Sequence, residues 1–336
     1  MRRHVTINIL MICCGLFYFV NNNSVTANAN ESQGSTDIPY SVTPVFSKSQ
    51  LDRSVSYFDL LVSQGETEIV EINISNHSEK LIVVNIEPYT ARTTSNGTVD
   101  YSGMDLKSSE SLKLYFEDLV LGDKRLEIPP KSTKNVIFSL LVPEKKFDGI
   151  LLGAFNIQEE SIEKKDKYHS DFSIKNTFSY IIACQLRMDE KQVPKQFFLD
   201  SVKVGSYGGY FSIMLDIIND APVLISDLSL ESKIINKDEE EVHTIKNEKF
   251  SMAPNSIYSY SEEIDKEILK PGEYTMKMLI KSKSGKKEWN TSKKFNITEE
   301  KGGMMIDHNI KVKKESNMVL CSVIIASILI IVFIFS

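Results

Sequence analysis

Short runs of β-forming residues, separated by turn signals about every 10 to 15 residues, limit most strongly what this chain can fold into. In residues 210–218, apolar side chains occupy every second position of an expected strand. These side chains, Phe211, Ile213, Leu215 and Ile217, are predicted to face a core. No stretch of the body keeps a sustained apolar period of 3.6 residues, although Leu106 to Leu121 is the best candidate for a short helix. The pattern predicts an all-β chain built from antiparallel sandwiches.

The runs fall into two groups. Residues 38–190 are predicted to form one β-sandwich, with the charged stretch 158–171 as a solvated loop between strands. Residues 187–194 are polar and contain a proline, which indicates a linker. Residues 195–300 hold about seven expected strands in about 100 residues, a density typical of an immunoglobulin-like sandwich. We therefore expect two tandem immunoglobulin-like β-sandwich domains.

The first 29 residues have the layout of a secretory signal peptide. A short basic region is followed by an apolar run over residues 7–20 and by Ala27-Asn28-Ala29, a small-x-small pattern after which cleavage is expected. The alternative interpretation is an uncleaved N-terminal membrane helix. The short apolar run and the cleavage pattern favour the signal peptide, so the body is expected to be exported.

The last 19 residues, 318–336, carry no charge. At about 1.5 Å per residue they reach about 28 Å as a helix, close to the hydrocarbon thickness of a bilayer, which predicts a single-pass transmembrane helix. Residues 301–317 before it are expected to form a polar stalk. Lysines precede the helix and nothing basic follows it, against the usual charge bias, so the orientation rests on the signal peptide.

The net charge limits the kinds of partner this chain can bind, and its cysteine content indicates the compartment in which it resides. Removing Arg2 and Arg3 with the signal changes the net charge from −6 to −8, which excludes nucleic acid as an expected partner. Cys184 is the one cysteine of the exported body, so no internal disulfide forms there. An exported body without disulfides fits a Gram-positive cell surface, with a glycosylated secreted protein as the alternative.

Catalytic and metal-binding patterns are missing from the sequence. No His-x-x-x-His, Cys-x-x-Cys, Gly-x-Ser-x-Gly or phosphate-loop pattern occurs. Cys184 lies on an apolar run, which favours a buried structural thiol. No catalytic residue, metal or cofactor is predicted, and the chain is interpreted as a binding or scaffolding protein.

An ordered set of short motifs spans both expected sandwiches. Each is weak alone, and they occur in this order: Phe58-Asp-Leu, Gln64-Gly65, Asn76-His-Ser, Thr94-Ser-Asn-Gly97, Ile128-Pro-Pro-Lys-Ser-Thr-Lys134, Phe147-Asp-Gly-Ile-Leu-Leu-Gly153, Met252-Ala-Pro-Asn-Ser256 and Leu269-Lys-Pro-Gly-Glu-Tyr274. Together they resemble the WxL-interacting proteins of Gram-positive cell surfaces. The resemblance implies an N-terminal domain that binds peptidoglycan and a C-terminal domain that binds WxL-type surface proteins or host ligands.

Most residues of these motifs are interpreted as determinants of the fold. Glycines beside apolar strands permit close backbone approach, and Pro-Asn and Pro-Gly pairs form turns. Tyr274 is interpreted as a tyrosine-corner residue or a core residue, and Trp289 as a core residue. The fold-motif residues are Asp148, Gly149, Gly153, Pro254, Asn255, Pro271, Gly272 and Tyr274.

Sugar rings present apolar C–H faces, so aromatic side chains near turns are candidates for binding peptidoglycan. In the first sandwich these candidates are Tyr89, Tyr101 and Tyr115. In the second sandwich, sheet edges are candidates for accepting a strand of a partner.

Three functions remain to be distinguished. The leading hypothesis is a non-enzymatic bridge between membrane, peptidoglycan and a WxL-type surface protein or host ligand. The second is a host-directed adhesin without direct wall binding, in which only the second sandwich matters. The third is a wall-active enzyme whose carboxylates are dispersed along the sequence.

Overall fold

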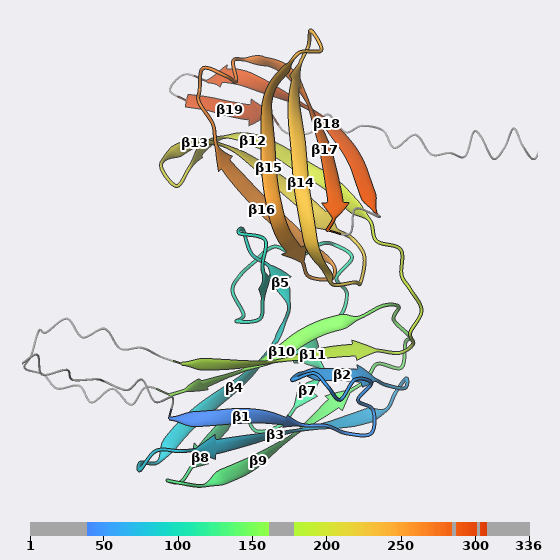
Figure 1. Ribbon diagram of the computed structural model, residues 1–336, viewed down its shortest axis with the longest axis vertical. Helices are drawn as coiled ribbons and strands as arrows, with labels where there is room; N and C mark the ends of the chain where they lie inside the picture. Colours follow the sequence, from blue (N-terminus) through green and yellow to red (C-terminus); the bar gives the residue numbers. More distant parts are fainter. Residues whose placement is uncertain (1–38, 161–177, 284–286, 301–302, 308–336) are drawn as a thin grey trace, which may run out of the picture. The chain divides into compact units, whose positions relative to one another are not determined.

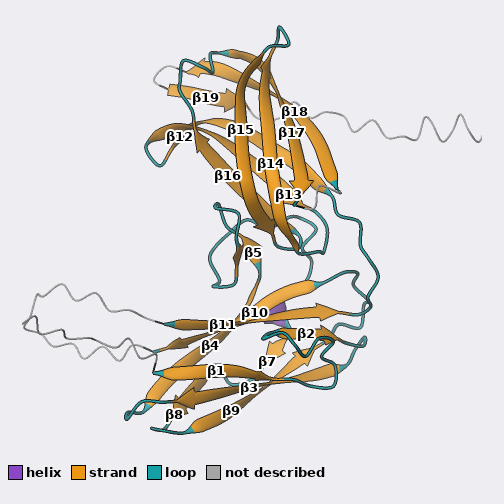
Figure 2. Cartoon of the chain, in the orientation of Figure 1, coloured by secondary structure: helices purple, strands orange, loops and turns teal. Residues whose placement is uncertain are grey.

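The computed structural model describes residues 39–160, 178–283, 287–300 and 303–307, and these residues form two β-sandwiches that each enclose a hydrophobic core. Strands dominate both, and the one helical element among them is a short 3-10 turn (Figure 2). The elements of the first sandwich are β1 (Tyr40–Val45), β2 (Phe58–Leu61), β3 (Thr67–Asn76), β4 (Ile82–Thr90), β5 (Arg92–Thr93), β6 (Val99–Asp100), η1 (Phe116–Asp118), β7 (Val120–Leu121), β8 (Arg125–Ile128), β9 (Thr133–Leu141), β10 (Leu151–Glu159) and β11 (Ser179–Arg187).

A four-stranded sheet, β1-β3-β9-β7, and a five-stranded sheet, β2-β11-β10-β4-β8, make up the first sandwich (Figure 1). All strand pairs in it are antiparallel except β2 with β11, which is parallel. Phe155 lies in the middle of the core, with ring centroids 6.3 Å from Phe58, 5.4 Å from Phe116 and 4.8 Å from Phe138. Aromatic packing across the two sheets thus fills the space that the alternating strands enclose.

The second sandwich pairs a three-stranded sheet, β12-β13-β16, with a five-stranded sheet, β15-β14-β17-β18-β19. Ile213, Leu215 and Ile217 are buried, and Phe211, the fourth residue of the predicted set, is partly buried against the same core, which confirms the alternation predicted for residues 210–218. β19 pairs with the end of β18 and lies inside the segment that was expected to be a stalk. The strands are β12 (Phe197–Tyr207), β13 (Tyr210–Asn219), β14 (Ile225–Asn236), β15 (Glu241–Met252), β16 (Ser256–Glu263), β17 (Gly272–Ser282), β18 (Glu288–Glu300) and β19 (Gly303–Asp307).

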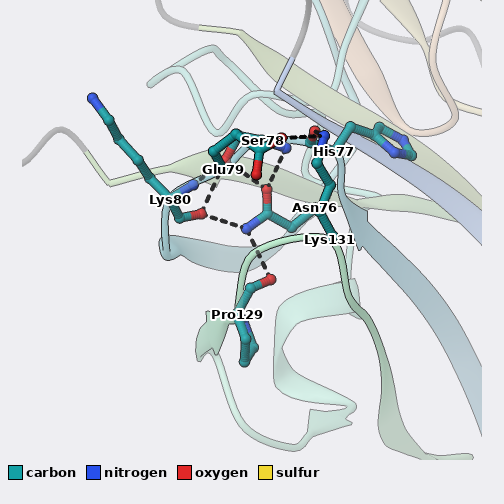
Figure 3. A network of polar contacts seen from close by, with 7 residues as sticks. All are labelled: Asn76, His77, Ser78, Glu79, Lys80, Pro129 and Lys131. Carbon is teal, nitrogen blue, oxygen red and sulfur yellow. Dashed lines mark hydrogen bonds and ion pairs between the residues drawn. The ribbon is translucent and has the colours of Figure 1, made fainter.

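A buried asparagine fastens the end of β3 to the turn that precedes β9 (Figure 3). The Asn76 side-chain nitrogen donates to the carbonyl oxygens of Lys80, at 2.7 Å, and of Ile128 and Pro129, each at 3.0 Å. Its side-chain oxygen accepts the backbone N–H of Ser78 at 2.9 Å. One buried side chain therefore donates to carbonyl groups of two loops, which it holds together.

The same arrangement recurs in the second sandwich at the end of β13. The Asn219 side-chain nitrogen donates to the carbonyl oxygens of Val223 at 2.9 Å and Ala253 at 2.8 Å. Its oxygen accepts the N–H of Ala221 at 3.3 Å. In both sandwiches the opposing turn contains a proline followed by a residue of positive φ: Lys131 at 51° and Asn255 at 50°. We call Asn76 and Asn219 the asparagine clamps.

The best candidate for a short helix, Leu106 to Leu121, forms no α-helix. The structure has the 3-10 turn η1 and the short strand β7 there, because several backbone groups of this segment bond to distant partners. The N–H of Phe116 donates to the Thr90 hydroxyl at 2.7 Å, and the N–H of Ser109 donates to the carbonyl of Asn255 at 3.0 Å. The apolar residues of this segment are spaced as in a helix, but each makes its own tertiary contacts.

Residues between β4 and β7 also contact the second sandwich. The Ala253 N–H donates to the Thr93 hydroxyl at 3.0 Å, and the Ser251 N–H donates to the Gly97 carbonyl at 2.7 Å. Lys107 pairs with Asp216 at 2.8 Å. These contacts join a long loop of the first sandwich to β13, β15 and the turn before β16.

Within the described ranges, no helix has the length and apolarity needed to cross a bilayer. The predicted signal peptide, 1–29, and the predicted transmembrane helix, 318–336, both lie outside those ranges.

Candidate glycan-binding face of the first sandwich

The outward face of β4, β10 and β11 brings together polar and aromatic side chains from three distant parts of the sequence. Side chains alternate along each strand, so residues next to the buried Ile86, Phe155 and Ile182 point outward. Strand register places them in three rows, which define what we call the Tyr89 face. The rows are Tyr89–Ala154–Ala183, Glu87–Asn156–Ile181 and Asn85–Gln158–Ser179.

Tyr89 and Tyr101, two of the predicted sugar-binding residues, lie close to this face. Gly103 sits directly on the Tyr89 ring, so that a Cβ atom there would lie 2.4 Å from ring carbon Cε1. With φ at 81°, Gly103 also has a backbone conformation that suits glycine. Tyr101 packs beside the buried Leu152, and burial raises its pKa to about 12. One short turn therefore lies across this end of the face and half-buries both rings.

Tyr115, the third candidate, belongs to a different group. Its ring is 36% exposed and lies under the Arg92 guanidinium, 5.5 Å from the ring centroid. Burial lowers the pKa of Arg92, and Glu117 and Tyr115 counteract that effect. The Arg92 guanidinium already covers one face of the Tyr115 ring, so Tyr115 is less suited than Tyr89 to stacking on a sugar.

The sequence did not indicate that amide side chains lie on this face. Asn156 and Gln158 occupy alternate positions on β10, on the side opposite the buried Phe155 and Ile157. The Asn156 side-chain oxygen accepts a hydrogen bond from the Ser179 hydroxyl. The signal that could have found them is this pair of amides at every second residue of a strand whose other side is apolar.

The chemistry of the face suits a neutral polar ligand. Amide groups both donate and accept hydrogen bonds, as sugar hydroxyls and acetamido groups do. Glu87, which shares the row of Asn156, forms an ion pair with Lys124 at 3.2 Å and is thereby partly neutralised. No group of three His, Cys, Asp or Glu residues within the described ranges is arranged to hold a metal ion. Cys184 is fully buried, and burial raises its pKa well above the ordinary value, which disfavours the reactive thiolate.

Comparison with protein-family models identifies both halves of the chain. Residues 40–159 match the model described as WxL Interacting Protein, peptidoglycan binding domain, and residues 169–305 match WxL Interacting Protein, host binding domain. The chain belongs to the WxL-interacting protein family. It carries the peptidoglycan-binding and host-binding domains of that family in order, which fits a surface binding protein.

Other comparisons add little to this assignment. No curated protein matches the chain. Similar solved structures include the Pseudomonas aeruginosa CupB2 chaperone, with 14% identity over 67% of this chain and 91% of that one at a TM-score of 0.27. The E. coli chaperone DraB has 13% identity over 75% of this chain and 98% of that one, also at 0.27. A PapD-like domain of human CEP192 has 10% identity over 46% and 87%, at 0.26. These TM-scores are too low to support any inference.

Two glycines of the family motifs lie where another backbone or ring comes very close. A Cβ atom on Gly149, which follows Asp148 and has φ at 69°, would lie 2.3 Å from the carbonyl oxygen of Pro222. A Cβ atom on Gly153 would lie 2.2 Å from the Phe116 ring. Neither site can hold a larger side chain without movement of its neighbours.

Motif residues of the second sandwich lie at turns and in the core. Pro254 and Asn255 form the turn before β16, and Pro271 and Gly272 lead into β17. Tyr274 is 9% exposed, and its hydroxyl donates to the carbonyl of Lys270 at 2.8 Å, which is the hydrogen bond of a tyrosine corner. Trp289 packs edge-on against Phe197 at 4.9 Å, and its ring N–H donates to the carbonyl of Lys195 at 3.1 Å.

Proposed function

We propose that this chain is a non-enzymatic scaffold of the cell surface that links peptidoglycan to a WxL-type surface protein or host ligand. The first sandwich holds the wall, the second holds the partner, and the apolar segment 318–336 holds the membrane as a single span. The body then lies outside the cell, within the wall. The ordered match of both family domains supports this division of work.

Within the first sandwich, the Tyr89 face is the proposed site for peptidoglycan. Asn156 and Gln158 supply hydrogen bonds to the sugar and peptide amides, and the exposed part of the Tyr89 ring supplies an apolar surface. An extended sheet face suits a polymer because a long glycan strand can lie across several rows of side chains.

Co-sedimentation with insoluble purified peptidoglycan tests this site. Each lost hydrogen bond costs about 1 kcal/mol, so Asn156→Ala combined with Gln158→Ala is expected to weaken binding by roughly tenfold or more. A matched control replaces Asn73 and Asn135, whose amides bond to one another at 2.9 Å on the outward face of the other sheet. Equal pelleting of both double variants would refute the site. Failure of the unaltered chain to pellet would refute the wall-binding role itself.

The partner-binding role is tested by pull-down with a purified WxL-domain protein. The chain is expected to retain the partner at micromolar concentration. Soluble fragments released from peptidoglycan in the same samples over several hours would instead indicate a wall-active enzyme.

A further inference from the structure

The hairpin of β12 and β13 (Figure 1) ends in two exposed tyrosines, Tyr207 and Tyr210. Tyr207 and Tyr210 form a cross-strand pair and are 51% and 60% exposed. The two residues between them, Gly208 and Gly209, have φ of 60° and 89°, and no atom lies within 4 Å of where either Cβ would be. The glycine turn is therefore open, and about half of each tyrosine faces solvent.

Both rings belong to the outward face of the sheet β12-β13-β16. In the next row along this face, Gly205, Ser212 and Glu263 lie side by side. Gly205 has no side chain, and the nearest atom to its Cβ position is the end of Met214 at 3.9 Å. Ser212 is only 3% exposed, so the open part of this row lies over Gly205 and at the exposed Glu263.

The charge next to the tyrosines is acidic. Residues 262–267 hold four carboxylates and one lysine, Lys266. Glu262 is engaged by Tyr260 at 2.6 Å and His243 at 3.2 Å, whereas the exposed Glu263 bonds to no side chain in the described ranges. A carboxylate without a partner beside two aromatic faces is complementary to a cation, because the ring faces and the carboxylate both attract positive charge.

The same sheet face already receives a lysine at its other end. Lys107, from the long loop between β6 and β7, reaches Asp216 at 2.8 Å, where Ser201 and Ser259 also donate to the carboxylate. The ammonium of Lys266 also lies 5.5 Å from the Phe211 ring centroid, on the hairpin itself. The outward face thus binds one lysine of this chain, at Asp216, and the tyrosine end continues that surface; the Lys266 contact lies on the core side of the hairpin.

From these contacts we infer that Tyr207, Tyr210 and Glu263 form a docking site for a basic segment of a partner protein. An arginine or lysine of the partner lies on the tyrosine rings and bonds to Glu263. The inference rests on the proposed partner-binding role of the second sandwich, and it names the chemistry of the partner surface. Rigid, exposed tyrosines flanked by glycine and serine also lose little side-chain entropy on binding, as in antibody paratopes.

A test that needs no identified partner uses the full chain labelled with 3-fluorotyrosine. The Tyr207 and Tyr210 resonances are assigned with Tyr207→Phe and Tyr210→Phe. The probe is a short peptide of alternating arginine and glycine, titrated to about 20 mM because a contact this small supports millimolar binding. Both resonances are expected to shift in a saturable way, and the matching glutamate–glycine peptide is expected to leave them unchanged.

Substitution of the acid separates the inference from a general attraction to the surface. Glu263→Gln is expected to weaken peptide binding about two- to fivefold, the usual range for one exposed ion pair. Glu248→Gln, an exposed acid on β15, is the matched control and is expected to change nothing. Three results would overturn the inference: tyrosine resonances that do not shift, an equal effect of both peptides, or peptide binding that Glu263→Gln does not weaken. A stronger response to neutral chitotriose would assign the site to a glycan and overturn it as well. None of these outcomes bears on co-sedimentation or on the WxL-domain pull-down, so the proposed function is judged separately.

Discussion

Replacing Asn76 with alanine removes three hydrogen bonds at once, those to the carbonyl groups of Lys80, Ile128 and Pro129. Asn76 is only 2% exposed, so water cannot replace its amide without entering the core. Each neutral hydrogen bond contributes about 1 kcal/mol, and three of them are lost together. The free energy of unfolding of the first sandwich should therefore fall by about 3 kcal/mol, roughly 150-fold in the unfolding equilibrium.

Cys184 offers a direct assay of that change. It is the only cysteine in residues 39–307, and it is fully buried in the core of the first sandwich. Labelling by a thiol reagent requires opening of that core, so Asn76→Ala should raise the labelling rate by about two orders of magnitude when opening is faster than labelling. Urea unfolding of the same protein supplies an independent value of the free energy.

Two further variants determine whether the amide donor is responsible. Asn76→Asp keeps the acceptor for Ser78 but places a carboxylate against carbonyl oxygens, so it should destabilise at least as much as alanine. Asn73→Ala, on the outward side of the same strand, should change stability by less than about 0.5 kcal/mol. A loss of under about 1 kcal/mol for Asn76→Ala would refute the reasoning.

Three other predictions follow from single contacts. Gly153→Ala places a methyl group against the Phe116 ring and should cost about 1–3 kcal/mol, seen as a lower Tm in calorimetry. Tyr274→Phe removes the hydrogen bond to Lys270 and should cost about 1 kcal/mol in urea unfolding. Burial raises the pKa of Asp216, but three side-chain hydrogen bonds outweigh it and leave the pKa below its ordinary value. A lowered pKa means stability that is present above the unfolded pKa and lost as pH falls through the folded one, so Asp216→Asn should reduce the loss of stability measured between about pH 5 and pH 3.

Local alternation was sufficient to predict much of the fold. On β13 the residues that face the core are every second one, because side chains of a strand alternate between its two faces. Tyr274 was predicted as a corner residue or a core residue, and its buried ring and bonded hydroxyl meet both descriptions. The helical candidate Leu106 to Leu121 forms no α-helix, because Leu112, Phe116 and Leu119 are buried without lining one helical face.

The candidate sites are built from residues far apart in the sequence, so they could not be predicted from any one segment. The Tyr89 face exists because strand register aligns Tyr89 with Ala154 and Glu87 with Asn156, residues almost 70 positions apart. Neither asparagine clamp was predicted, because an asparagine at the end of a strand looks like an ordinary turn residue until the facing loop is known. Exposure of Tyr207 and Tyr210 likewise required knowledge of what the rest of the chain leaves uncovered.

The single buried thiol has a mechanical consequence. With Cys184 as the only cysteine in the described ranges, no covalent bond joins the two sheets of either sandwich. In the proposed arrangement, with the wall holding one end of the chain and the membrane the other, the chain would be stretched whenever the space between them widens. Each residue released from a sandwich then adds about 3.5 Å of length, and the domain can fold again when tension falls. A chain held in that way would act as an extensible tether, and the two asparagine clamps would help to set the force at which it lengthens.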